Sequence, residues 1–265
     1  MKIQGALLKM RSELNDPVDY FLKLNEQELH MNNLINKELK ITFLDEIHCI
    51  RCGRLTKKSF HQGYCYPCFR TAPETDDCIL RPEKCQAHEG ISRDMEWSKN
   101  NCLQEHIVYL AISSGLKVGI TRLTQVPTRW IDQGASFAIK IAQVPNRNTA
   151  GLLEVNLKKY FADKTNWRNM LTNKIDRESS LLEQKNKAKE LVKKEFVKYF
   201  IDDNDIVELA YPVIEFPEKV NSFSFDKEQS ISGKLMGIKG QYLIFDGGRV
   251  LNIRKHNGYE VELEY

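Results

Sequence analysis

The 265-residue sequence has no run of roughly 20 apolar residues, the length that spans a bilayer. The segment from Met1 to Lys9 also lacks the long apolar stretch and small-residue cleavage site of a secretory signal peptide. There is no long internal repeat and no low-complexity tract. These absences argue against a membrane protein and a secreted protein, and they predict a cytoplasmic location.

The number and spacing of the cysteines do not fit a disulfide framework. The chain has seven cysteines, an odd number, and most of them occur in pairs separated by two residues. Disulfide-stapled domains usually carry an even number, whereas paired cysteines in a reducing compartment are typical of metal ligands. At this length the chain can bury a sizeable core without disulfides.

The net charge of +3 hides an uneven distribution. Residues 106–174 carry ten Lys and Arg against three Asp and Glu, whereas residues 1–105 and 175–265 have net charges of −1 and −3. A local net charge of +7 would concentrate an anionic partner, and nucleic acid is the commonest one. The alternative is a basic face that only keeps the protein soluble.

The patterning predicts an α+β protein with four segments. They are an N-terminal β segment (1–45), a cysteine-rich, zinc-ribbon-like segment that binds zinc (46–105), an α/β domain that ends in a long helix (106–204) and a small β domain (205–265). The last segment has the short apolar runs and frequent glycines of a small barrel or meander. A faint likeness between residues 5–10 and 233–238 suggests that the two ends complete one β module.

Periodicity gives the expected elements of the central segments. Strands are expected at 18–24, 39–44, 107–112, 116–120 and 137–144, and helices at 127–134, 149–161 and 180–201. The run 107–112 and the alternating run 116–120 flank Ser113-Ser114-Gly115, so they predict a β-hairpin. The helix over 180–201 is expected to be the longest.

The first cysteine group predicts a structural zinc site. Cys49 and Cys52 form one pair, and Cys65 and Cys68 form a second pair twelve residues later. Each pair makes a tight knuckle that places two thiolates on one side of a tetrahedral ion. Four thiolates leave no position for water, so the zinc would be structural. Two redox-active pairs or an iron–sulfur cluster are the alternatives.

A second site is expected from the remaining cysteines. Its candidate ligands are Cys78, Cys85, His88 and Cys102, with spacings of six, two and thirteen residues. His106 or His61 could replace a weaker ligand. The alternative is one or two small buried thiols beside a surface histidine.

Short motifs follow in the basic segment. Val108-Tyr109-Leu110 lies in the first expected strand and Lys117-Val118-Gly119 in the second, and Arg129 and Glu154 lie on the two helices that follow. Residues 106–175 resemble the GIY-YIG nuclease superfamily, with Tyr109 and Gly119 matching its two name motifs. The resemblance implies a nuclease-like fold in which Arg129 and Glu154 are the arginine and the metal-binding glutamate. Lys117 stands where the second motif has a tyrosine.

The resemblance implies phosphodiester chemistry at these positions. Glu154 would hold a catalytic Mg²⁺ or Mn²⁺, Arg129 would grip the phosphate, and Tyr109 would orient or deprotonate water. Lys117 would bind phosphate as a point charge. The expected nucleic-acid contacts are made by Lys117, Arg122, Arg129 and Trp130. Each key residue also has a structural interpretation: a core position for Tyr109, a solvated flank for Glu154 and a pair with Asp132 for Arg129.

The whole chain also resembles an uncharacterised family of bacterial proteins with zinc knuckles, a hairpin domain and a C-terminal β segment. The phrases that carry this likeness are 117–122, 129–135 and 237–243. The sequence therefore predicts a zinc-containing nucleic-acid-binding protein, with metal-dependent endonuclease activity as its catalytic form. The alternatives are a non-catalytic RNA- or ribosome-binding factor and a zinc-stapled interaction scaffold.

Overall fold

The computed structural model describes residues 1–265 and has the predicted mixture of helices and strands, with thirteen strands in all. The chain forms two compact units. Unit 1 comprises Met1–Arg70, Leu171–Asn173 and Leu209–Tyr265, and unit 2 comprises Thr71–Met170 and Lys174–Glu208. The finer division into four segments stays a prediction.

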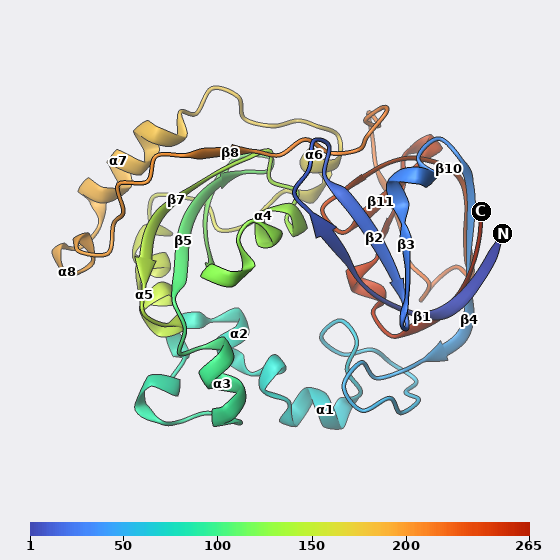
Figure 1. The fold of residues 1–265 in the computed structure, drawn as a ribbon, viewed down its shortest axis with the longest axis horizontal. Coiled ribbons are helices and arrows are strands. Elements are labelled where there is room, and N and C mark those ends of the chain that lie inside the picture. Colours follow the sequence, from blue (N-terminus) through green and yellow to red (C-terminus); the bar gives the residue numbers. More distant parts are fainter. The chain divides into compact units, whose positions relative to one another are not determined.

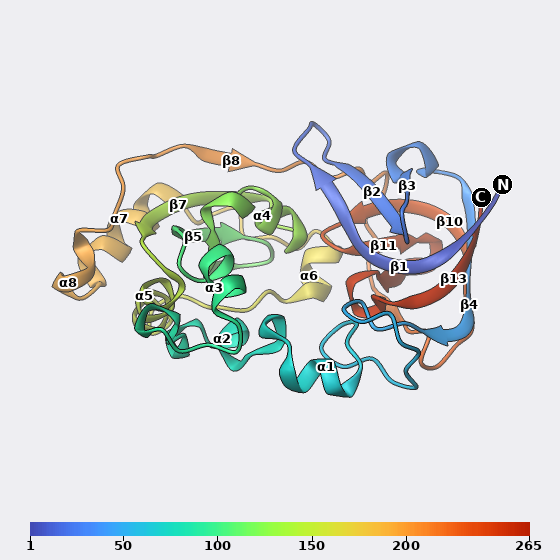
Figure 2. The same cartoon turned by 60° about the horizontal axis from the view of Figure 1, so that its bottom comes forward.

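Unit 1 is built on one nine-stranded sheet in the order β3-β2-β1-β13-β4-β10-β11-β12-β9. Its strands are β1 (Lys2–Glu13), β2 (Asp19–Leu24), β3 (Gln27–His30), β4 (Glu38–Ile47), β9 (Asn221–Phe223), β10 (Ser230–Lys239), β11 (Tyr242–Phe245), β12 (Arg249–Asn252) and β13 (Tyr259–Glu264). Figure 1 shows the two ends of the chain close together, and Figure 2, which labels both strands, shows β1 beside β13. The C-terminal strands thus join the N-terminal ones in one sheet, as the likeness between the two ends suggested.

A buried glutamine supplements the backbone pairing in this sheet. Gln241, in the turn between β10 and β11, is 3% exposed. Its Nε2 donates to the Met10 carbonyl oxygen at 3.1 Å, and its Oε1 accepts from the Met10 N–H at 2.9 Å. One side chain therefore satisfies both polar backbone groups of a residue in the middle of β1, which would otherwise be costly to bury.

Unit 2 is organised around a four-stranded antiparallel sheet in the order β6-β5-β7-β8. Its strands are β5 (His106–Ile112), β6 (Leu116–Arg122), β7 (Phe137–Val144) and β8 (Ile206–Glu208). Helix α1 (Tyr66–Thr71) belongs to unit 1 except for its last residue. The helices of unit 2 are α2 (Asp77–Leu80), α3 (Met95–Asn101), α4 (Thr128–Asp132), α5 (Arg147–Leu157), α6 (Trp167–Leu171), α7 (Leu181–Leu191) and α8 (Lys194–Val197), with Leu171 at the end of α6 assigned to unit 1. The predicted hairpin and third strand are confirmed.

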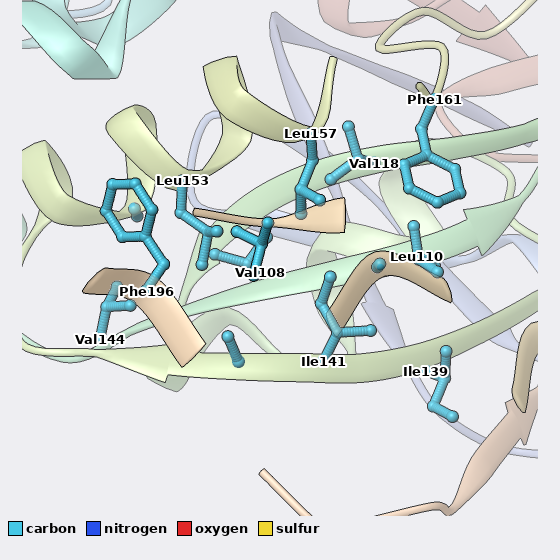
Figure 3. Packing of buried hydrophobic residues seen from close by; sticks show 14 of the residues in the cluster. Val108, Leu110, Val118, Ile139, Ile141, Val144, Leu153, Leu157, Phe161 and Phe196 are labelled. Atoms are coloured by element: carbon cyan, nitrogen blue, oxygen red, sulfur yellow. The ribbon is translucent and has the colours of Figure 1, made fainter. Parts of the chain in front are cut away.

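The alternation along β5 separates two faces of this sheet. Val108 and Leu110 point into a core that includes Leu153 and Leu157 of α5, as Figure 3 shows. The residue between them, Tyr109, points to the other face, where its ring packs edge-on against Trp130 of α4. The helices α4 and α5 therefore lie on opposite faces of this sheet, and Figure 1 shows α4 on the side of β5 away from α5.

The prediction of one long helix over 180–201 is wrong, because the helix of the structure is shorter. It ends at Leu191, because Val192 has an extended backbone with φ −73° and ψ 150°. The side-chain oxygen of Asn156 accepts a hydrogen bond from the next backbone N–H, that of Lys193, at 3.2 Å. The short helix α8 then returns Phe196 to the same core, which explains why the apolar pattern continues across the break. None of the helices is long and apolar enough to cross a bilayer.

Candidate metal centres and a buried lysine site

The first cysteine cluster consists of Cys49, Cys52, Cys65 and Cys68, whose sulfur atoms all lie within 4.8 Å of one another. A tetrahedral ion with Zn–S bonds of about 2.3 Å places its sulfur atoms about 3.8 Å apart. The Sγ atoms of Cys52 and Cys65, from different knuckles, are 3.8 Å apart. The two pairs therefore converge on one point, which fits a single four-coordinate ion better than two separate redox pairs.

Backbone hydrogen bonds shape both knuckles of this cluster. The carbonyl oxygen of Cys49 accepts from Gly53 N–H at 2.8 Å, and that of Cys65 accepts from Phe69 N–H at 2.8 Å. Gly53 has φ +69°, a left-handed conformation that glycine adopts without strain. Burial disfavours the Cys49 thiolate, but backbone N–H groups bonded to its sulfur keep the pKa of this thiol below its usual value. The first knuckle is thus shaped to hold a thiolate at Cys49.

The second cysteine cluster contains three of the four expected ligands. The sulfur atoms of Cys78, Cys85 and Cys102 lie within 4.8 Å of one another. No histidine belongs to the group: the Nε2 of His88 lies 3.8 Å from a carboxylate oxygen of Glu89. Burial lowers the pKa of His106 to about 4, and its Nδ1 is 2.7 Å from the Gln104 carbonyl oxygen. Both cysteine clusters could hold zinc, the second with thiolates alone.

A close helix contact fixes the second cluster within unit 2. Cys85 directly follows a 3₁₀ turn, η3 (Pro82–Lys84), which packs on α5. A Cβ atom at Gly151 of α5 would lie 2.2 Å from the Glu83 backbone nitrogen, so only glycine permits this approach. The Asn148 side chain also donates to the Glu83 carbonyl oxygen at 2.9 Å.

The sheet face that carries Tyr109 also holds a buried cluster of polar side chains. We call this cluster the buried lysine site, and it consists of Tyr109, Lys117, Gln133 and Thr165. Tyr109 and Lys117 are 1% and 3% exposed. The Oε1 atom of Gln133 accepts from the Tyr109 hydroxyl at 2.9 Å and from Lys117 Nζ at 2.5 Å. Lys117 Nζ also donates to Thr165 Oγ1 at 2.7 Å. Tyr109 and Lys117 were expected at this site, whereas Gln133 and Thr165 were not.

Local geometry explains how these groups meet. Tyr109 and Gly119 face each other in the antiparallel register of β5 and β6. The absent side chain of Gly119 makes room for the tyrosine, since a Cβ there would lie 2.7 Å from its hydroxyl oxygen. The segment after α5 bridges to Lys117 at Ala162, and this contact brings Thr165 to the amine.

Burial controls the protonation of the lysine. Desolvation, with a smaller contribution from the positive charge of Arg129, lowers the pKa of Lys117 to about 7 from its ordinary value of 10.5. Burial also raises the pKa of Tyr109, although the positive charge of Arg129 opposes this effect. Near neutral pH the amine is therefore neutral in a large fraction of molecules, while the tyrosine stays protonated.

Glu154 interacts with this group electrostatically, but its carboxylate already has a cation. Glu154 is 8% exposed, and its Oε2 lies 3.2 Å from Lys158 Nζ. The same ammonium is 3.4 Å from Asp163. Burial raises the pKa of Glu154, while Lys158 opposes the shift. The carboxylates as arranged do not fit a Mg²⁺ or Mn²⁺ site, because Lys158 occupies the cation's place.

Two of the expected nucleic-acid contacts also make contacts inside unit 2. Trp130 is 1% exposed, and its ring packs edge-on against Tyr109. Arg122 donates to the side-chain oxygen of Asn101 at the end of α3. Arg129 is only partly buried and lies close enough to Tyr109 for its positive charge to affect the pKa of the tyrosine.

These features define a class of cysteine-rich α+β protein with two thiol clusters that could hold zinc and a buried lysine on a small antiparallel sheet. The chain belongs to the family described as Protein of unknown function (DUF2797), whose model matches residues 36–261. No curated protein and no solved structure matches it. The expected family of uncharacterised proteins is thus confirmed, whereas the nuclease superfamily and a bacterial origin stay predictions.

Proposed function

We propose that this chain is a zinc-containing nucleic-acid-binding protein with a nuclease-like phosphate site in unit 2. The supporting observation is the convergence of Tyr109 from β5, Lys117 from β6 and Arg129 from α4. These residues are distant in sequence, and a hairpin followed by a helix brings them together. The strand order β6-β5-β7, with α4 and α5 on opposite faces, agrees with the nuclease-like arrangement that the motifs suggest.

The charges of this segment also support a phosphate ligand. Arg129 offers a planar guanidinium that can donate two hydrogen bonds to one phosphate group. Because the pKa of Lys117 is about 7, its amine carries a full positive charge only when the pH is below that value. Phosphate binding should therefore tighten as the pH falls through 7, because the amine gains its proton.

Hydrolysis of a phosphodiester is a second candidate function, and the lowered pKa of Lys117 favours it. A neutral amine that donates to Gln133 and Thr165 keeps its lone pair free to accept a proton from water. A general base works best when its pKa lies near the working pH. Lys117 would then take over the role of the missing motif tyrosine, and Arg129 would stabilise the charge that develops on the phosphate.

The binding test uses labelled DNA and RNA oligonucleotides and a range of salt concentrations. Wild type should show a negative slope of log affinity against log salt, and Arg129→Ala should reduce that slope by roughly 0.7–0.9 for each phosphate that the variant no longer neutralises. Lys187→Met, which removes an exposed lysine on α7, serves as the matched control and should change neither affinity nor slope. Equal slopes for wild type and Arg129→Ala would contradict a phosphate site and favour the scaffold.

The cleavage test compares wild type with Lys117→Met and Glu154→Gln in Mg²⁺, Mn²⁺ or EDTA. Loss of cleavage in Lys117→Met with binding retained above pH 7 would support a general base. Cleavage that requires a divalent ion and disappears in Glu154→Gln would instead support the metal-binding glutamate. Salt-sensitive binding without cleavage under any condition would leave a non-catalytic RNA- or ribosome-binding factor.

A further inference from the structure

The second cysteine cluster differs from the first in the number of its ligands. Its three sulfur atoms lie within 4.8 Å of one another, and no fourth His, Cys, Asp or Glu side chain completes the group. All three cysteines are free thiols. Their mutual distances suit a single ion, since the thiolates of an iron–sulfur cluster are divided between two or more irons and three of them would not all lie this close together. Three protein ligands with a remaining open position are the pattern of zinc sites that accept an outside ligand.

A pocket of about 300 Å³ opens directly onto this cluster. All three cysteines line it, together with Asp76, Arg93 and Trp97. Cys85 and Cys102 are 3% and 1% exposed, whereas Cys78 is half-buried. A ligand in the pocket can therefore approach the sulfur atoms from one side, while the other sides are packed. The volume suits a small molecule.

Charge and softness indicate which ligand the pocket would take. Three thiolates outweigh the two positive charges of Zn²⁺, so the ion becomes a weak Lewis acid that prefers another soft sulfur ligand to hydroxide. An added thiolate would bring one more negative charge. The guanidinium of Arg147 lies near Cys102 and supplies compensating positive charge, whereas Arg93 in the pocket wall is already paired with Asp76, with its Nε 3.0 Å from the carboxylate.

We infer that Cys78, Cys85 and Cys102 hold a zinc ion whose fourth position faces the pocket and binds a small-molecule thiol as its thiolate. On binding, the thiol loses its proton to solvent and a Zn–S bond forms in place of a water ligand. This site is a ligand-binding centre, in contrast to the saturated first cluster.

The test uses the full chain reconstituted with Co²⁺, whose absorption reports its ligands. Wild type should bind two cobalt ions, and Cys102→Ser should bind one. The difference spectrum belongs to the second cluster. Addition of 2-mercaptoethanol should shift its ligand-field bands and raise its thiolate-to-cobalt absorption by about one third, as three thiolates become four. The remaining spectrum of Cys102→Ser should not respond.

Two further variants control for a failure of Cys102→Ser to fold and for a role of His88 as a ligand. Cys78→Ser changes the half-buried ligand and should also bind only one cobalt, even if Cys102→Ser fails to fold. His88→Ala should keep both ions and the thiol response. Any of four results would overturn the inference: one cobalt in wild type, no spectral response to the thiol, a spectrum altered by His88→Ala, or fewer than seven titratable thiols in the denatured metal-free chain.

Discussion

The buried amine of Lys117 should make the stability of unit 2 depend on pH in a defined direction. Its pKa is about 7 in the folded chain and 10.5 when solvated, so the unfolded state binds the proton more tightly. Stability should therefore be lowest below pH 7 and rise as the pH goes from 7 towards 10.5. The difference between the two pKa values corresponds to roughly 4–5 kcal/mol in total, and to at most about 1.4 kcal/mol per pH unit.

Lys117→Met isolates this effect, because methionine fills a similar volume without a charge. The variant also lacks the hydrogen bonds to Gln133 and Thr165, but their absence does not depend on the charge of the amine. The expected observable is therefore the change with pH of the stability difference between wild type and Lys117→Met, and not the size of that difference at one pH. Between pH 7 and pH 10, the stability of wild type relative to Lys117→Met should rise by roughly 4 kcal/mol.

The assay is denaturant unfolding followed by tryptophan fluorescence. The three tryptophans, at positions 97, 130 and 167, all lie in unit 2, so the signal reports that unit alone. Lys187→Met, on an exposed face, should stay within about 0.5 kcal/mol of wild type over the whole range. A wild-type advantage that stays constant from pH 7 to pH 10 would refute a neutral buried amine, and the general-base role would fail with it.

Three further outcomes test how the sites are built. Gly119→Ala should destabilise unit 2 by about 1–3 kcal/mol in thermal unfolding, because the new Cβ would meet the Tyr109 hydroxyl, whereas Gly115→Ala has nothing within 4 Å and should be nearly neutral. Gly151→Ala should push η3 away from α5 and release the metal of the second cluster, so that each chain holds one metal ion fewer; two retained ions would contradict this account. Structural zinc contributes on the order of 10 kcal/mol to the free energy of folding, so a strong chelator should unfold the part of unit 1 around the first cluster. Amide hydrogen exchange would measure this, and unchanged protection would argue against a structural ion.

Local pattern was enough to predict much of the fold. The strand expected at 137–144 matches β7, because alternation and flanking turn residues mark both of its ends. The break after Leu191 could not be predicted, since its cause is a hydrogen bond from the Lys193 backbone to Asn156, 37 residues earlier. The repeating apolar positions on both sides of the break read as one helix.

The residues of the candidate sites could likewise be predicted only where local spacing determines them. The first cysteine cluster is encoded by local spacing, so the sequence indicated all four ligands. Gln133 and Thr165 carry no such signal, because they meet Lys117 only through the folding of α4 and of the segment after α5. The spacing of His88 to Cys85 predicts a ligand, but spacing alone does not fix the direction of a side chain, and His88 lies outside the cluster.

The position of β13 between β1 and β4 bears on the order in which the chain is made. A ribosome completes the sequence of unit 2 long before residues 259–264 emerge, so unit 2 can fold while the sheet of unit 1 still lacks the strand that joins its two halves. Until then β1 and β4 each present an unpaired edge, and such edges invite pairing with other chains. The nascent chain is therefore most vulnerable to aggregation between the emergence of unit 2 and that of residues 259–264, and a chaperone that covers strand edges would help it most in that interval.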